Sequence, residues 1–173
     1  GLRRQTRFAC VLAGQAFPAN PLAPSGVGGH APAASSAAGY DPAAAKALLD
    51  RFGYGNRDAD GYRKTPDGHP LTIVLSLRTG TTTRETQTLW KKDMDAIGIR
   101  IDFRISPFQD MVKEVISGKF QMFSGGFGGT PTAEGIFQQL DGRQPAATNT
   151  TPFDNADYNA AMDQYRRSGT TPE

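Results

Sequence analysis

The order of its apolar segments constrains the fold of this 173-residue chain more than any other feature. In LTIVLSL (71–77) and IRIDFRI (99–105), large apolar residues occupy every second position, which is the period of a β-strand. Between the two segments, Trp90, Met94 and Ile97 recur at the spacing of one face of an amphipathic helix. The pattern therefore predicts a strand, a helix and a second strand in succession.

Strands and helices continue to alternate toward the C-terminus. Ser106 and Gln109 have the spacing of a capping box with Pro107 at the first helical position, and this helix is expected to end at Gly118. FQMFS (120–124) is a third short strand that enters a glycine-rich loop. Three other helices are expected at residues 41–53, 134–140 and 157–167.

This alternation predicts an α/β fold in which parallel strands are joined by right-handed helical crossovers. The charges that alternate along residues 99–105 indicate that this strand is antiparallel or lies at an edge. Ligands of such sheets bind beyond the carboxyl ends of the strands. The segments RTGTTTRE, SPFQD and SGGFGGTP follow the three predicted strands and would open on one rim. That convergence is the strongest physical indication of a site.

Charge and apolar content exclude two classes of function. The 19 basic and 17 acidic residues leave a net charge of +2, and no run of lysine or arginine forms a nucleic-acid surface. No apolar run approaches the ~18 residues of a membrane-spanning helix. The single cysteine, Cys10, cannot form an internal disulfide and is expected to be a small buried apolar residue.

The two ends of the chain suggest a piece of a longer protein. The first residues lack the apolar core and cleavage site of a signal peptide and begin within a helical pattern, while RRSGTTPE has the signature of a helix about to begin. Residues 14–40 are rich in Pro, Gly, Ala and Ser and are expected to cross the surface in extended form. We therefore expect a helix end and connector over residues 1–40 and an α/β domain over residues 41–173.

The glycine loop after the third strand lacks the features of a nucleotide site. A phosphate-binding P-loop requires a lysine, and none follows Lys119. The dinucleotide fingerprint requires a third glycine where Pro131 stands. A flexible linker is not favoured, because apolar segments flank the loop on both sides. Two interpretations stay open: the glycines around Phe127 let the backbone approach either a ligand or a neighbouring element.

The stretch NRDADGYRKTPD has the spacing of a calcium loop. Asn56, Asp58 and Asp60 occupy positions 1, 3 and 5 of an EF-hand-like loop, in which oxygen ligands alternate around a tight turn. Lys64 at the ninth position disfavours a cation. The stretch also ends in a Pro–Asp–Gly turn that leads to a strand, so turn chemistry explains it equally well.

No catalytic machinery is visible in the sequence. His30 and His69 are the only histidines, and no cluster of Cys, His and acidic residues supplies the three or four ligands of zinc. A nucleophilic serine in a G-x-S-x-G elbow is absent, and Asp93 and Asp95 lie among lysines on a helix face. We therefore expect no enzyme activity, no metal and no cofactor.

Several motifs, taken in order, resemble the extracellular solute-binding proteins of family 5, the dipeptide- and oligopeptide-type components of ABC importers. They run from about residue 15 to residue 167 and comprise YDPAAAKALL, a DADG turn, PDGHPL, LWKKDMDAIGI, and GKFQM before a glycine–aromatic–glycine loop. Family members are much longer and close two lobes over a solute. The resemblance implies that this chain is the second lobe, of the periplasmic-binding-protein type II, with a mixed sheet flanked by helices.

The resemblance also implies which residues face the solute. The aromatic residue of the glycine loop, here Phe127, lies in the cleft of family members. Peptide binders carry an aspartate three positions later that pairs with the peptide α-amino group, and here Thr130 cannot offer that charge. Ser124 stands where some peptide binders carry arginine, and Phe108 matches an aromatic at the start of the helix after the second strand. The implied ligand-binding residues are Phe127, Gly126, Gly128, Thr130, Phe108 and Ser124.

The implied function is to capture a peptide or other small solute and deliver it to the membrane permease of an ABC importer. The protein would act in the periplasm, or outside the cell as a lipid-anchored protein. Residues 79–83 and Ser106 are candidates either for orienting an anionic solute group at helix N-termini or for plain capping and turn roles. A fragment of an α/β-hydrolase-like enzyme and a calcium-stabilised interaction module are the alternatives.

Overall fold

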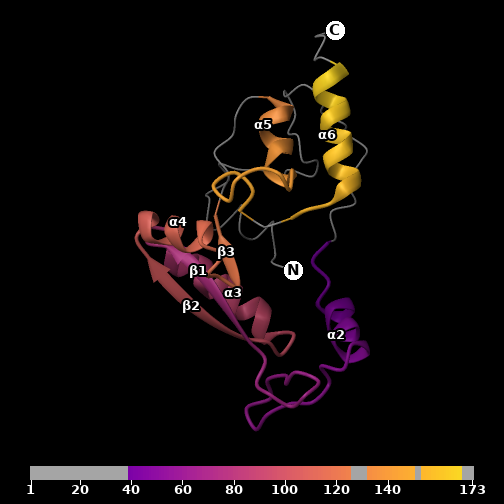
Figure 1. The fold of residues 1–173 in the computed structure, drawn as a ribbon. Coiled ribbons are helices and arrows are strands. Elements are labelled where there is room, and N and C mark those ends of the chain that lie inside the picture. The colour runs from indigo at the N-terminus through magenta and orange to yellow at the C-terminus, as the bar shows by residue number, and fades with distance from the viewer. Residues whose placement is uncertain (1–38, 126–131, 151–152, 169–173) are drawn as a thin grey trace. The chain divides into compact units, whose positions relative to one another are not determined.

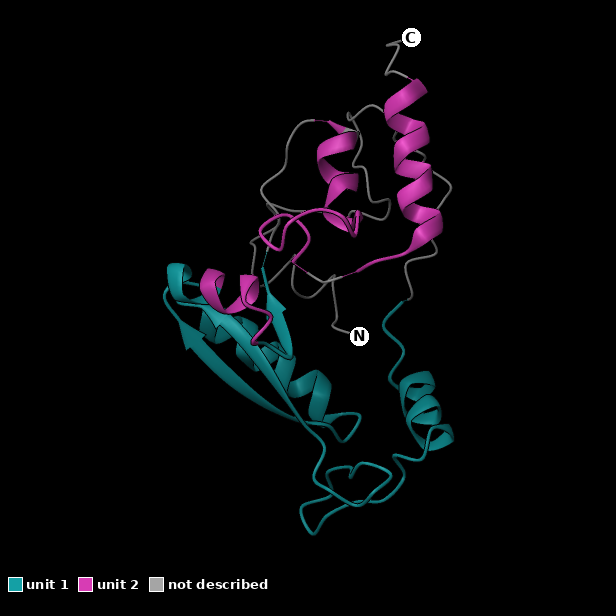
Figure 2. Cartoon of the chain, viewed as in Figure 1, with its two compact units in different colours: residues 1–18, 37–111, 120–125 teal, residues 19–36, 112–119, 126–173 magenta. Residues whose placement is uncertain are grey.

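The structure, a computed structural model, describes residues 39–125, 132–150 and 153–168 (Figure 1). These residues fall into two compact units: the first comprises 39–111 and 120–125, and the second comprises 112–119, 132–150 and 153–168 (Figure 2). Each unit is considered on its own. Almost all of the expected connector lies outside the described residues, so the boundary at residue 40 stays a prediction.

The first unit contains a three-stranded parallel sheet. Its strands are β1 (Thr72–Arg78), β2 (Arg100–Ser106) and β3 (Met122–Ser124), in the order β2-β1-β3. The α/β fold class is therefore confirmed, and β2 lies at an edge of the described sheet, as its alternating charges predicted. Antiparallel pairing occurs in the described part of the chain only as isolated bridges, at Arg57–Arg63 and Lys64–Pro70.

Three helices accompany the sheet in the chain: α2 (Pro42–Arg51), α3 (Thr83–Asp95) and α4 (Phe108–Ile116). Asp41 caps α2 as expected, because its carboxylate accepts a hydrogen bond of 2.9 Å from the N–H of Ala44. α3 ends at Asp95, before Ile97, the last residue of the predicted helical stripe. Gly98 then turns the chain toward β2 with a φ of 79°.

The capping box predicted at Ser106 does not form. Ser106 is the last residue of β2, and its buried Oγ has no hydrogen-bond partner among the described residues. The carbonyl of Pro107 instead accepts the N–H groups of Asp110 and Met111, both at 3.1 Å. The reason is the strand pairing, which holds Ser106 in β2, opposite Arg78, rather than at the helix start.

The core of the first unit is built from the sheet and α3. Leu75 of the central strand is 0% exposed, and it clusters with Ile101 of β2 and with Met94 and Ile97. Leu49 of α2 is partly buried against the same cluster. The alternating apolar residues of the two strands and the helical stripe between them thus meet in one core, as their periods predicted.

The second unit contains the predicted C-terminal helices. They are α5 (Ala133–Phe137), the 3₁₀ helix η2 (Gln138–Leu140) and α6 (Ala156–Ser168). Thr132 caps α5 by accepting a hydrogen bond of 3.2 Å from the N–H of Gly135. The hydroxyl of Tyr158 on α6 donates to the carbonyl of Phe137 at 2.9 Å, which ties the two helices together. Within the described residues, no helix has the length and apolar character needed to cross a lipid bilayer.

Candidate functional site

The three strands end side by side at one edge of the sheet. Arg78 of β1 lies opposite Ser106 of β2, and Leu77 lies opposite Ser124 of β3. Because the strands are parallel, the segments that follow them leave from this edge, which confirms that the three junctions share one rim. We call the edge formed by residues 78–83, 105–108 and 124–125 the carboxyl rim.

The segment after β1 is rich in threonines, and its hydrogen bonds show what two of them do. The N–H of Thr79 donates to the carbonyl of Ser106 at 2.9 Å, which extends the pairing of β1 and β2. The hydroxyl of Thr83 donates to the carbonyl of Arg78 at 2.9 Å and closes the turn into α3. Thr82 makes no side-chain cap bond and is exposed. Thr83 therefore has a turn role, while Thr82 stays a candidate for solute contact.

Two large apolar side chains of the carboxyl rim are exposed. Along one face of β2, the exposed fraction rises from 6% at Ile101 to 47% at Ile105. Phe108, which the sequence predicts as a ligand-binding residue, is 59% exposed at the first residue of α4. The rim therefore offers apolar contact area at the end of β2.

The segment after β3 begins with a tight contact. Ser124 ends β3 in a half-buried position. At Gly125, a Cβ atom would lie 2.8 Å from Cε2 of Phe123, so a larger residue requires the ring to move. The other predicted ligand-binding residues lie outside the described part of the chain, so their role stays a prediction: Gly126, Phe127, Gly128 and Thr130.

The carboxylates proposed for calcium are paired with an arginine. Asp58 accepts the N–H groups of Asp60 and Tyr62 at 3.0 and 2.9 Å, and its other oxygen accepts Nη2 of Arg100 at 2.9 Å. The same nitrogen lies 3.2 Å from Oδ2 of Asp60. Burial raises the pKa of Asp58, but the bonds from Arg100, Tyr62 and Asp60 outweigh it, so the pKa lies below its ordinary value. A guanidinium therefore supplies the positive charge in this turn.

The described residues contain no group of three or more His, Cys, Asp or Glu side chains arranged to hold a metal. Asn56, the other calcium candidate, uses its backbone carbonyl to accept the N–H of Lys64 at 2.8 Å. His69 faces Asp67 across 3.5 Å in an exposed pair, and His30 lies outside the described residues.

The sequence did not reveal a buried arginine in the turn before β1. Arg63 is 1% exposed, and its Nε donates to the carbonyl of Ile97 at 2.8 Å. Its Nη1 donates to the carbonyl of Tyr54 at 2.7 Å and also binds Asp50 of α2. One guanidinium thus ties α2 and the turn to the end of α3. No periodicity in this polar stretch marks Arg63 as different from its neighbours, which are less buried.

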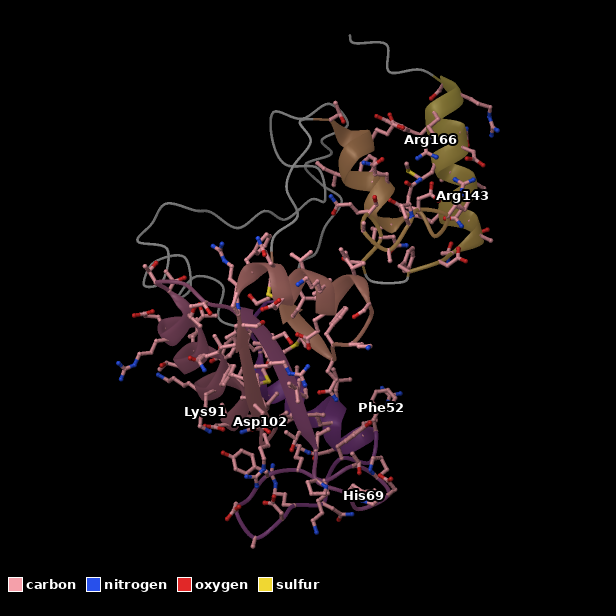
Figure 3. All side chains as sticks on the ribbon, turned by 60° about the vertical axis from the view of Figure 1, so that its left-hand side comes forward. Phe52, His69, Lys91, Asp102, Arg143 and Arg166 are labelled. Atoms are coloured by element: carbon pink, nitrogen blue, oxygen red, sulfur yellow. The ribbon has the colours of Figure 1, made fainter. Side chains whose placement is uncertain are left out.

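A second unpredicted set of ion pairs lies in the second unit. Arg166 of α6 places Nη1 3.2 Å from Oδ2 of Asp141 and Nε 3.1 Å from Glu134 of α5. Arg143 contacts the same aspartate and also Asp163 of α6, at 2.9 Å. Both arginines are labelled in Figure 3. Because the side chain of Asp141 is fully buried, these pairs hold α5 and α6 together rather than contact a solute.

A model of one protein family matches most of the chain. It is described as "Bacterial extracellular solute-binding proteins, family 5 Middle" and matches residues 4–148. None of the curated proteins matches the sequence.

Several solved structures share the fold. A periplasmic oligopeptide-binding protein of an ABC transporter from Thermotoga maritima, with bound mannohexaose, has a TM-score of 0.79 at 19% identity over 97% of this chain and 34% of that chain. AppA from Bacillus subtilis, in complex with a nonapeptide, has a TM-score of 0.78 at 16% sequence identity over 94% of this chain and 33% of that chain. NikZ from Campylobacter jejuni, in complex with Ni(L-His), has a TM-score of 0.74 at 19% sequence identity over 97% of this chain and 34% of that chain. The fold is that of type II periplasmic binding proteins, and the chain spans about a third of each of these structures.

Proposed function

Because this chain belongs to the bacterial extracellular solute-binding proteins of family 5, we propose that it is the solute-binding second lobe of the substrate-binding component of an ABC importer. The chain spans only 34% of the first similar structure, so the activity, solute and partners of the whole protein are all part of this proposal. The observation that supports it most is the carboxyl rim, where three parallel strands of a family-5 chain end together.

The proposed mechanism is capture by closure. A solute rests on the carboxyl rim, a second lobe closes over it, and the closed form docks on a membrane permease. On this lobe, Phe108 and Ile105 supply apolar contact area, and Thr82 and Ser124 supply hydroxyl groups. Binding takes place in the periplasm or, with a lipid anchor, at the cell exterior.

The proposed cargo is a small solute, peptide or otherwise. The similar structures hold an oligosaccharide, a nonapeptide and a nickel–histidine complex, so the fold accommodates solutes of very different charge. Thr130 has no negative charge with which to pair an ammonium group. We therefore favour a solute whose α-amino group is not recognised at this position.

The two alternatives raised by the sequence have no support in the comparisons. The family match and the similar structures are to solute-binding proteins, rather than to hydrolases or calcium-stabilised modules. We propose that the protein catalyses no reaction and that its only chemical task is reversible binding.

Native mass spectrometry of the full-length protein tests the proposal. We expect a small molecule that remains bound in the native spectrum and is released on denaturation, and that rebinds to the stripped protein. Turnover of an ester or peptide panel, abolished by changing one serine or aspartate, would instead establish an enzyme and contradict the proposal.

A further inference from the structure

We propose that Gln121 is a positioning residue for solute binding, because its side chain helps to fix the register in which β3 brings Ser124 to the carboxyl rim. This inference rests on the proposed function and extends it to a residue that lies before the rim in the chain.

The strand that carries Ser124 is held by few backbone pairs. β3 is paired with β1 at only three positions, from Leu75–Met122 to Leu77–Ser124, whereas β1 and β2 are paired at seven. A slip of one residue would move β3 by about 3.3 Å and turn each of its side chains to the opposite face of the sheet. Such a slip would remove Ser124 from its place opposite Leu77.

The side chain of Gln121 continues the pairing where the backbone of β3 stops. Its Oε1 accepts a hydrogen bond of 2.7 Å from the backbone N–H of Val74. Val74 directly precedes Leu75, the first residue of β1 that pairs with β3, and Gln121 directly precedes Met122. The amide oxygen therefore adds one directional bond that is satisfied in this register, and a shift of one residue would separate the two groups.

The apolar contacts of β3 specify its register only in part. Met122 packs against the core of the first unit, and Phe120 and Phe123 meet edge to face with ring centroids 5.0 Å apart. A slip of one residue would turn Met122 away from the core, but a slip of two residues keeps each side chain on its own face of the sheet, and non-directional apolar contacts discriminate less against it. The hydrogen bond from Val74 would be lost in either slip, so it adds a directional constraint on the register.

Loss of this bond should weaken solute binding as well as local order. Without an acceptor at position 121, the N–H of Val74 loses its partner and β3 samples frayed or shifted positions. A solute that requires the native register then binds only the fraction of molecules in which β3 is in that register, and the apparent affinity falls in proportion to that fraction.

The experiment uses the full-length protein and three variants. Gln121→Met removes the acceptor at nearly constant length, Gln121→Glu keeps an oxygen that can accept the bond, and Gln164→Met changes an exposed glutamine of α6 as a matched control. The probes are mannohexaose, a mixed nonapeptide library and Ni(L-His), titrated by calorimetry. Amide hydrogen exchange at Val74 reports the bond itself.

We expect Gln121→Met to accelerate exchange at Val74 and to weaken binding of the probe by about three- to tenfold. Gln121→Glu should restore both properties, and Gln164→Met should leave both unchanged. If exchange accelerates in Gln121→Met but affinity equals that of the wild type, Gln121 is only structural and this inference is overturned, while the proposed function stands. If the wild type binds no probe and carries no co-purified solute, the proposed function fails and this inference fails with it.

Discussion

Arg143 holds the buried carboxylate of Asp141 at two points, with Nε 2.8 Å from Oδ1 and Nη2 3.0 Å from Oδ2. The backbone N–H of Arg143 adds a third bond to Oδ1 at 3.1 Å. These bonds, with the nearby charge of Arg166, lower the pKa of Asp141 well below its ordinary value although burial opposes ionisation. The fold of the second unit therefore depends on an ionised aspartate in its interior.

The first prediction concerns pH. An aspartate whose pKa is lower in the folded state stabilises the fold above the unfolded pKa of about 3.9, and this contribution is lost progressively as the pH falls from about 5 through that value toward the lower folded pKa. We expect the free energy of unfolding to decrease below about pH 5, and to decrease less steeply in Asp141→Asn, which has no charge to lose. Urea unfolding across this pH range measures both slopes, with Asp157→Asn as an exposed control on the same unit. Equal slopes in wild type and Asp141→Asn would contradict the prediction.

The second prediction concerns Arg63. Arg63→Met should lower the free energy of unfolding by about 2–4 kcal/mol, because the carbonyls of Ile97 and Tyr54 lose their donor inside the protein. Arg84→Met, at an exposed position of α3, should change it little. Chemical denaturation of the two variants provides the comparison, and similar losses in both would show that the buried bonds of Arg63 contribute nothing specific.

The third prediction concerns calcium. Neither EDTA nor added calcium should shift the melting temperature of the wild-type protein, because Asp58 and Asp60 already share an ion pair with Arg100. Arg100→Ala should lower the melting temperature only slightly, since surface ion pairs contribute little. A calcium-dependent rise in the wild type, measured by differential scanning fluorimetry, would support the calcium-stabilised module instead.

The fourth prediction concerns the apolar part of the carboxyl rim. Phe108→Ala in the full-length protein should weaken binding of the solute panel by about tenfold while leaving the melting temperature nearly unchanged, because its exposed ring is free to contact a solute. Phe52→Ala removes a ring that is 66% exposed at the C-cap of α2 and should affect neither property (Figure 3). We expect Phe127→Ala to behave like Phe108→Ala. A lower melting temperature with unchanged affinity would instead show that Phe108 stabilises the fold and does not contact the solute.

Local periodicity was sufficient to predict most of the secondary structure. The two alternating segments became β1 and β2 with starts and ends displaced by one residue, and the Asp41–Pro42 pair marked the start of α2. The convergence of the strand ends followed from parallel topology alone, because parallel strands joined by helices end at the same edge. These features depend on residues that are close together in the sequence, so the order of the residues is enough to predict them.

Long-range partners were not predictable in the same way. Ser106 had the sequence of a helix cap, but pairing with Arg78 of a distant strand kept it in β2. The side chain of Gln121 gave no sign that its oxygen would accept the N–H of Val74, 47 positions earlier. Arg63 and Asp141 stand in polar, turn-rich stretches whose composition is typical of exposed residues, yet the structure buries both.

The sequence by itself determined the strands and helices, the α/β class and the family, because periodicity and motif order are properties of the chain. Only the tertiary structure decided which charged groups are buried, which carboxylates pair with an arginine and which side chain adds a hydrogen bond to the pairing of β3 with β1. The physical reason is that burial of a charge and pairing of a strand are stabilised by groups far away in the chain. Those groups come within hydrogen-bonding distance only when the sheet and the helices have assembled.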